Sequence, residues 1–396
     1  MSNVIYFVLF TWFLGNMGIH FFTPQLPAMS HALNTSSQLL QMAVSVFLLG
    51  KAIGVIVWGP LAERYGRRTF LLTGLALYAI TSLAISLSQS IETILILRFC
   101  QGLSVSATVL MGRTMINDLF PEKKAIKAFA LLFTLAGIII AFLPMMGSFI
   151  GSQASWQVAF YAMAAYASFL WFIGLKALPE TRPYQPQTLN FTQILSDYRL
   201  VLSNRLFLTY LSISALMVAG ESAFNTSASF ILIKTHGFSI HHYGLVKTSL
   251  AIAHLIGSAL CIRAVNYYQP RTLLAIGVTS FLIGSLLMLI LNQLHLPILT
   301  ALLLPMLIYY FGTGFITATV SAVIVRPFPK KMATAMAFCI FLQFITSSGF
   351  SFLASSLNIQ TAMPLAWIIV FVSGFNFLLW MSLNTAELKQ QPASSI

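Results

Sequence analysis

Residues 59–68 read GPLAERYGRR and lie between two long apolar runs. Four charged side chains, Glu63, Arg64, Arg67 and Arg68, fall within these ten residues, although Asp, Glu, Lys and Arg make up only 7% of the chain. The stretch begins with Gly59, and Gly66 separates its first two charges from its last two. Glycine permits tight turns and close approach of helices. The stretch is therefore typical of a short charged turn between two apolar helices.

The composition places most of the chain in lipid. Of its 396 residues, 58% are hydrophobic, and the mean hydropathy is +0.87. A water-soluble fold of this size needs a more polar exterior than such a composition supplies. A membrane-spanning helix needs about 20 apolar residues, because the bilayer core is roughly 30 Å thick and offers no partners to backbone groups. We therefore expect an all-α membrane protein.

Twelve apolar runs have the required length. They cover residues 4–23, 39–61, 69–88, 93–117, 125–150, 156–178, 206–233, 243–264, 271–291, 297–325, 333–356 and 362–383. The only long polar stretch, residues 179–204, separates six runs from six. Paired six-helix halves are how one large class of transporters is built. We expect an N-terminal six-helix bundle over residues 1–178, a cytoplasmic linker over 179–204 and a C-terminal six-helix bundle over 205–396.

The basic residues are distributed asymmetrically among the predicted loops. If the N-terminus is cytoplasmic, the inside loops carry almost all of the loop Lys and Arg residues, and the outside loops carry essentially Lys234 alone. Positive charge on the inside is the rule for membrane proteins. We expect a multi-pass protein of the bacterial cytoplasmic (inner) membrane with both termini in the cytoplasm. The net charge of +13 then requires no nucleic-acid partner.

The turn at residues 59–68 resembles the cytoplasmic signature loop of the major facilitator superfamily. The matching residues are Gly59, Glu63, Arg64, Gly66, Arg67 and Arg68, with Glu63 where the family usually has Asp. The resemblance implies the major facilitator fold, with 12 transmembrane helices in two six-helix bundles, and a loop that acts as a conformational latch. Asp118, at the cytoplasmic end of the fourth run, is its implied carboxylate partner. In a simpler interpretation, the charges of the loop only set the topology.

Three further stretches resemble twelve-helix drug:proton antiporters, particularly the Bcr/CflA-like branch. Residues 98–120 resemble the helix 4 signature of that branch, with matches at Arg98, Gln101, Gly102, Arg113 and Asp118. Residues 141–160 resemble its helix 5 antiporter motif at Pro144 and Gly147, with Leu143 and Ser148 replacing small residues. Residues 19–29 resemble a helix 1 segment of the branch, but His20 stands where the branch has an acid. Cation export therefore does not carry over from the resemblance.

Ionisable side chains inside membrane spans are costly and mark functional sites. Glu221 is the only acid in the middle of any predicted span, and we expect its protonation to change during transport. A permanent ion pair is the alternative. Lys51 and Arg113 are expected to line a cavity, although Arg113 could instead extend to the cytoplasmic interface. Arg98 could bind substrate or hold several carbonyl groups of the bundle.

Neutral polar residues complete the predicted site. Asn16 and His20 lie one helical turn apart, so their side chains point the same way. His20 either lines the cavity as a hydrogen-bonding group or carries a proton in place of the missing acid. Gln101 and Asn225 are further candidates for substrate binding, and Asn225 could instead bond a neighbouring helix.

The charges of the predicted cavity are mainly basic, which favours carboxylates over lipophilic cations. We expect a proton-coupled exporter of an anionic or zwitterionic small molecule, such as a polycarboxylate metabolite or a siderophore, that works as a monomer in the bilayer. The alternative is a broad multidrug:proton antiporter for lipophilic or cationic drugs. Protons are the expected coupling ion, without cofactor or metal. Neither a phosphate-binding loop nor a hydrolase pattern occurs in the sequence, so no enzyme is expected.

Overall fold

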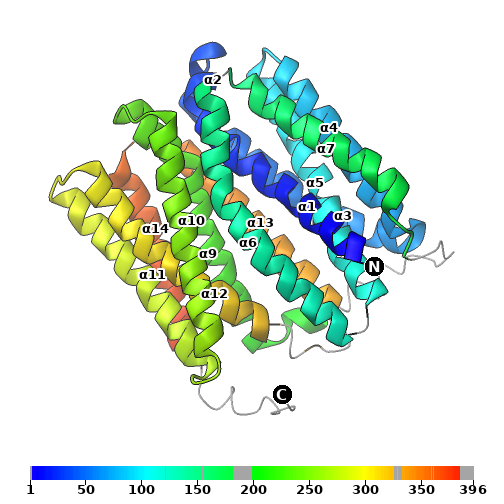
Figure 1. Cartoon of the computed structure of the whole chain (residues 1–396). Coiled ribbons are helices and arrows are strands. Elements are labelled where there is room, and N and C mark those ends of the chain that lie inside the picture. The colour runs from blue at the N-terminus through cyan, green and yellow to red at the C-terminus, as the bar shows by residue number, and fades with distance from the viewer. Residues whose placement is uncertain are drawn as a thin grey trace. The chain divides into compact units, whose positions relative to one another are not determined.

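The computed structural model describes residues 2–120, 122–153, 155–181, 199–324, 328, 332–357, 359 and 361–383 (Figure 1). Inside these ranges, nothing is described of the side chains of residues 2, 3, 60, 63, 64, 113, 117, 122–134, 136, 322 and 332–334. The predicted candidates Glu63, Arg64 and Arg113 therefore have a described backbone only.

Helices follow the predicted apolar runs. The first half of the chain contains α1 (Ser2–His20), η1 (Thr23–Gln25), α2 (Leu26–Ala32), α3 (Ser37–Tyr65), α4 (Arg67–Leu87), α5 (Ile91–Leu119), α6 (Glu122–Gln153) and α7 (Gln157–Ala177). The second half contains α9 (Arg205–Ser229), η2 (Phe230–Thr235), α10 (Ile240–Ala264), α11 (Pro270–Gln293), η3 (Leu299–Leu303), α12 (Leu304–Val323), α13 (Met332–Ser356) and α14 (Ala362–Met381). Each of the twelve runs coincides with a helix, as predicted.

Length and composition make most of these helices candidates for membrane spans. Among the described residues, eleven helices are long and apolar enough to cross a bilayer. A twelfth, α6, has a shorter apolar stretch, Gly137–Gln153, within the residues whose side chains are described. Serine caps mark two helix starts: Ser36 Oγ accepts from the Leu39 nitrogen at 3.3 Å, and Ser90 Oγ accepts from the Thr93 nitrogen at 3.4 Å.

The described chain forms two compact units. Unit 1 comprises Met1–Leu189, Ser222–Ala251 and Ser348–Gln360, and unit 2 comprises Asn190–Glu221, Ile252–Ser347 and Thr361–Ile396. Residues of α9, α10 and α13 are thus divided between the units. The predicted division into 1–178, 179–204 and 205–396 stays a prediction, and residues 182–198 of the linker lie outside the described part.

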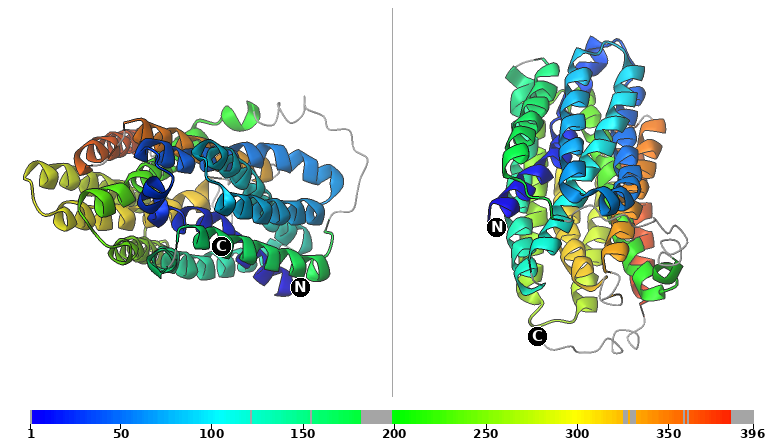
Figure 2. Two further views of the ribbon diagram at one scale, coloured as in Figure 1. Left: turned by 90° about the horizontal axis from the view of Figure 1, so that it is seen from above. Right: turned by 90° about the vertical axis from the view of Figure 1, so that its right-hand side faces the viewer.

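In unit 1, α5 packs against α3, α4 and α1, and α7 packs against α4. The blue-to-cyan helices α3, α4 and α5 lie side by side in Figure 2. Glycines bring α3 and α5 together, because a β-carbon at Gly50 would overlap the Phe99 carbonyl and one at Gly102 would overlap the Phe47 carbonyl. Small residues at such crossings are how membrane helices pack closely.

In unit 2, α11 packs against α12 and α14. Gly277 and Gly312 face each other, since a β-carbon at Gly312 would lie 2.6 Å from the Gly277 carbonyl oxygen. One turn along each helix, the rings of Phe281 and Tyr309 stack with centroids 3.9 Å apart. The close contact between α11 and α12 thus fixes the direction in which Tyr309 points.

Candidate functional site

The signature loop forms a tight turn between α3 and α4. Gly66 ends α3 and precedes α4 with φ +98°, a conformation that favours glycine. Arg67 follows, and its Nε donates to Asp118 Oδ2 at 2.7 Å. The Asp118 carboxylate, near the end of α5, also accepts from Thr181 Oγ1 at 3.1 Å. The predicted partner of the loop is therefore in contact with it.

A second acid, missed by the sequence reasoning, lies at the N-terminus of α4. Glu180 follows α7 and accepts hydrogen bonds from the backbone nitrogens of Arg67 at 2.8 Å and Arg68 at 3.2 Å. A carboxylate at a helix N-terminus satisfies free N–H groups and complements the helix dipole. Arg68 in turn donates through a guanidinium nitrogen to the Leu175 carbonyl at 2.7 Å. The start of the predicted linker is thus tied to the signature loop.

Arg98, in unit 1, is completely buried. Its guanidinium donates to the carbonyl oxygens of Gly18 at 2.8 Å and Ala43 at 3.4 Å, and to Gln101 Oε1 at 2.6 Å. The rings of Phe22 and Phe47 lie 4.1 Å and 4.2 Å from its guanidinium carbon. Arg98 is therefore satisfied by protein groups and has no exposed surface for a substrate.

The Gln101 amide extends this network to another helix. Its Nε2 donates to Ser82 Oγ of α4 at 2.7 Å, and the Ser82 hydroxyl donates to the Tyr78 carbonyl at 2.7 Å. Both Gln101 and Ser82 are buried. The polar network that starts at Arg98 thus connects α1, α3, α4 and α5.

A separate basic cluster in unit 1 brings together His20, Lys51 and Lys247. The side chains of Lys51 and Lys247 are only 7% and 3% exposed, and both lie close enough to His20 for their charges to act on its ring. Lys247 Nζ donates to Asn225 Oδ1 and lies 4.8 Å from the Phe224 ring centroid. The His20 side chain is half-buried.

The remaining polar candidates on α1 and α9 belong to the same unit. Asn16 is half-buried, one turn before His20, and its Nδ2 donates to the Trp12 carbonyl at 3.2 Å. Asn225 is half-buried on α9 and is held by Lys247. The structure therefore unites two predicted residues of α1, one of α3 and one of α9 with a lysine of α10.

Lys247 was missed although its signal is in the sequence. It lies inside the apolar run 243–264, where an ionisable side chain is as exceptional as Lys51 is in α3. Applying the same criterion to this run would have identified it.

The antiporter motif lies where α6 meets the end of α1. A β-carbon at Gly147 would lie 2.6 Å from the His20 carbonyl oxygen, and Gln25 Nε2 donates to the Gly147 carbonyl at 3.0 Å. Pro144 lies inside α6, one turn before this contact. The two helices therefore pack closely beside His20, although Leu143 and Ser148 replace the small residues of the branch.

Glu221 is the last residue of the first segment of unit 2. It is half-buried on α9, and its charge acts on the buried hydroxyl of Tyr309 on α12. On α10, His254 is also half-buried, and its Nδ1 lies 2.8 Å from the hydroxyl oxygen of Thr313. The predicted proton-coupling acid thus has a tyrosine beside it that the sequence analysis did not single out.

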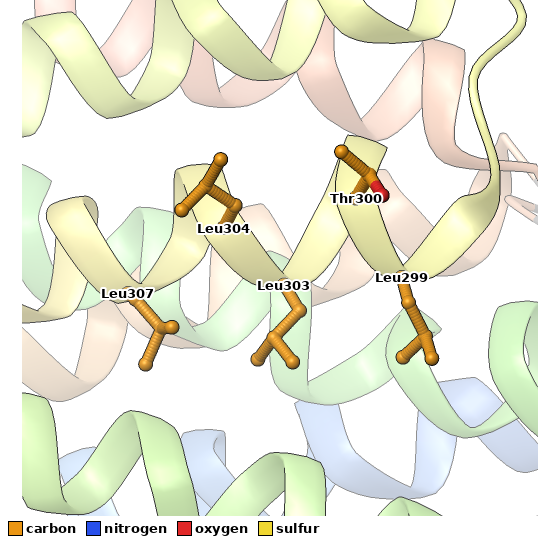
Figure 3. A pocket seen from close by; sticks show the side chains of 5 residues that line it. All are labelled: Leu299, Thr300, Leu303, Leu304 and Leu307. Atoms are coloured by element: carbon orange, nitrogen blue, oxygen red, sulfur yellow. The ribbon is translucent and has the colours of Figure 1, made fainter.

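A surface hollow of about 330 Å³ lies elsewhere in unit 2 (Figure 3). Leu299, Thr300, Leu303, Leu304 and Leu307 line it, all from η3 and the first turn of α12. Four leucines and one threonine offer no charge to bind or move a proton. We do not assign this hollow to the functional site.

The arrangement of long apolar helices, with buried cations and an acid inside the spans, defines a multi-pass membrane transporter. The family comparison agrees: the model of the Major Facilitator Superfamily matches residues 7–350. The chain belongs to this superfamily.

The relatives of the chain include proteins named for drug resistance. The chain is 27% identical over 384 residues to the multidrug resistance protein MdtL of Salmonella typhimurium, covering 96% of this chain and 95% of the relative. It is 27% identical over 305 residues to the chloramphenicol resistance protein CraA of Acinetobacter baumannii, covering 77% and 73%. An uncharacterised MFS-type transporter of Bacillus subtilis, YdgK, is 25% identical over 382 residues, covering 95% and 94%.

Solved structures agree on the fold. A D-xylose–proton symporter superimposes with a TM-score of 0.79 at 18% identity, covering 98% of this chain and 99% of the symporter. The human organic anion transporter MFSD10 superimposes with a TM-score of 0.70 at 17% identity, covering 96% and 98%. At these identities the likeness establishes the major facilitator fold alone.

Proposed function

We propose that the chain exports a small anionic or zwitterionic organic molecule in exchange for protons. A polycarboxylate metabolite or a metal-chelating siderophore has the required chemistry. The observation that carries this proposal is the pair of buried lysines, Lys51 and Lys247, beside His20. The acids that are described in unit 1 lie at helix ends: Glu92, Asp118 and Glu180. Asp118 and Glu180 both contact Arg67 of the signature loop.

The physical argument is one of charge and desolvation. Burying ammonium groups is costly, and an anion that enters the cluster offsets part of that cost through charge-assisted hydrogen bonds. A lipophilic cation would be repelled by the same two groups. Asn225 already accepts from Lys247, so a substrate carboxylate would replace a neutral amide oxygen with a charged one.

Proton coupling is assigned to Glu221. An acid in a membrane span can bind a proton from one side and release it to the other as the site changes access. His20 is the second candidate for carrying a proton, and its role as a neutral wall residue is the alternative. Protons serve as the coupling ion in either case.

The signature loop is proposed to act as a conformational latch. Arg67 and Asp118 connect α4 to α5, and Glu180 connects α4 to the segment after α7. A transporter of this kind alternates between a state open to one side of the membrane and a state open to the other. Breaking these contacts during transport would favour one of the two states. We further propose membership of the Bcr/CflA-like branch, location in the bacterial inner membrane, both termini in the cytoplasm and a monomeric state.

A broad multidrug:proton antiporter is the second candidate function. The names of the MdtL and CraA relatives favour it, since both refer to drug resistance. In that case lipophilic drugs would be the preferred substrates, and the two buried lysines would serve the structure rather than recognition.

Binding to purified protein separates the two functions. Citrate and a lipophilic cation would be compared as ligands of the wild type, Lys51→Met, Lys247→Met and the exposed control Lys176→Met. Citrate binding that is lost in the first two variants and kept in the control supports anion export. The multidrug function is supported if no variant binds citrate and if removal of the lysines leaves cation binding unchanged or improves it.

A further inference from the structure

Tyr309 of α12 is held in one orientation inside unit 2. Its side chain is completely buried, and its ring lies 3.9 Å from that of Phe281 on α11, with the planes tilted by 32°. Gly284, one turn along α11, allows the α12 backbone to approach, since a β-carbon there would lie 2.8 Å from the Tyr309 nitrogen. Stacking and close helix packing together fix the direction of the phenol hydroxyl.

That hydroxyl lies against α9 beside Glu221. A β-carbon at Gly220 would overlap the Tyr309 hydroxyl, so the oxygen contacts the helix backbone there. The charge of Glu221 acts on the same side chain. Within the described residues the hydroxyl has no hydrogen-bond partner, whereas buried phenol hydroxyls ordinarily have one. The structure thus places an unused donor beside the acid.

The part of unit 2 that the structure describes places a tyrosine and a histidine near this pair. Tyr310 follows Tyr309 on α12 and interacts with it electrostatically. His254 of α10 bonds Thr313, one turn further along α12. From α11 and α14, the neighbours are the uncharged side chains of Phe281 and Val372. Within the described residues of unit 2, Glu221 is the only acid, and it is therefore the acid to which the Tyr309 hydroxyl can donate.

We infer that Tyr309 is a positioning residue for proton coupling, and that its hydroxyl donates a hydrogen bond to Glu221 once this carboxyl group has released its proton. The inference rests on the proposed role of Glu221. A donor to the carboxylate stabilises the deprotonated form, and the contact is given up when the carboxyl group is protonated. Tyr309 keeps its own proton throughout. It therefore shifts the protonation equilibrium of Glu221 without carrying the transported proton.

Infrared difference spectroscopy tests the inference about Tyr309. The spectra of the purified protein are recorded between acid and neutral pH. The chain has only 8 Asp and Glu residues, so a carboxyl band that is present in the wild type and absent in Glu221→Gln belongs to Glu221. In Tyr309→Phe we expect the pH midpoint of the Glu221 change to rise by about one unit, and the Glu221 carboxylate band at neutral pH to change its position, because the hydrogen bond exists only in the deprotonated form. Tyr210→Phe, at another buried tyrosine of unit 2, should leave both unchanged.

The outcomes separate the two proposals. If no band disappears in Glu221→Gln, the proton role of Glu221 is wrong. If the band exists and neither its position nor its midpoint changes in Tyr309→Phe, only the Tyr309 inference fails. A wild-type tyrosine ring band that changes with the carboxyl band, and is lost in Glu221→Gln, provides a test that does not need the Tyr309 variant to fold. A tyrosine band that persists unchanged in Glu221→Gln contradicts the inference.

Discussion

Arg67 Nε and Asp118 Oδ2 are 2.7 Å apart, so the loop between α3 and α4 is bound to the end of α5. The Arg67 side chain is 8% exposed and that of Asp118 is 26% exposed, so this pair is better shielded from water than a surface salt bridge. We expect Arg67→Gln and Asp118→Asn each to slow maximal transport by about tenfold, because a charge-assisted hydrogen bond contributes about 1.5–3 kcal/mol to the state that contains it.

Transport into liposomes measures this rate. The control is the reversed pair, Arg67→Asp combined with Asp118→Arg, which should recover part of the loss. Full activity in both single variants would show that the loop serves topology alone.

The conformation of Gly66 predicts a loss of stability on substitution. Gly66→Ala should lower the free energy of unfolding by about 1–2 kcal/mol, because φ +98° is unfavourable for a residue with a β-carbon. The new methyl group would also lie 2.5 Å from Glu180 Oε2. Thermal unfolding in detergent measures the effect, with Gly59→Ala as the control, since its β-carbon would meet Leu110 at an ordinary 3.8 Å. Equal unfolding temperatures for the two variants would contradict the prediction.

Glu180 provides a test of how the start of the linker is anchored. Glu180→Ala removes the acceptor for the Arg67 and Arg68 nitrogens and should cost about 1 kcal/mol, the range of a lost helix cap. Glu180→Gln keeps an oxygen acceptor and should lose less. Amide hydrogen exchange at the first turn of α4 reports the difference. Protection that is the same in both variants would mean that the cap is not formed in solution.

The sequence predicted the helices and part of the site, for physical reasons that differ. Each span is encoded locally, because a helix in lipid must satisfy its own backbone within about 20 residues. The pairing of Arg67 with Asp118 was also predictable, since the resemblance supplied both members. The contact between Glu180 and α4 was not, because it joins residues 113 positions apart. Tyr309 has an ordinary place in an apolar run, and only helix packing reveals that it adjoins Glu221.

Lys247 is expected to decide affinity for anions. Lys247→Met should weaken citrate binding by about 10- to 100-fold, the effect of losing one hydrogen bond to a charged group. Asn225→Ala removes only the neutral partner of Lys247 and should leave affinity within a few-fold of the wild type. Isothermal titration at constant pH measures both. Undiminished binding in Lys247→Met would exclude direct contact between this ammonium group and the anion.

Arg98 is expected to act through stability. Arg98→Lys should lower the free energy of unfolding by at least about 2 kcal/mol, because an ammonium group cannot replace the planar arrangement that reaches Gly18, Ala43 and Gln101. Arg263→Lys, an exposed change at the end of α10, serves as the control. A variant that unfolds like the wild type but no longer binds substrate would instead assign Arg98 to recognition.

The bonds of Arg98 also restrict how unit 1 can move. One guanidinium group and its glutamine partner join α1, α3, α4 and α5 through backbone carbonyls and a serine, which have fixed positions along each helix. Sliding α1 or α3 past α5 by one residue would take one carbonyl acceptor away from a buried positive charge, and sliding α4 would break the bond between Gln101 and Ser82. These four helices therefore behave as a rigid body, and the hinges and sliding surfaces that the proposed transport cycle requires must be sought outside it.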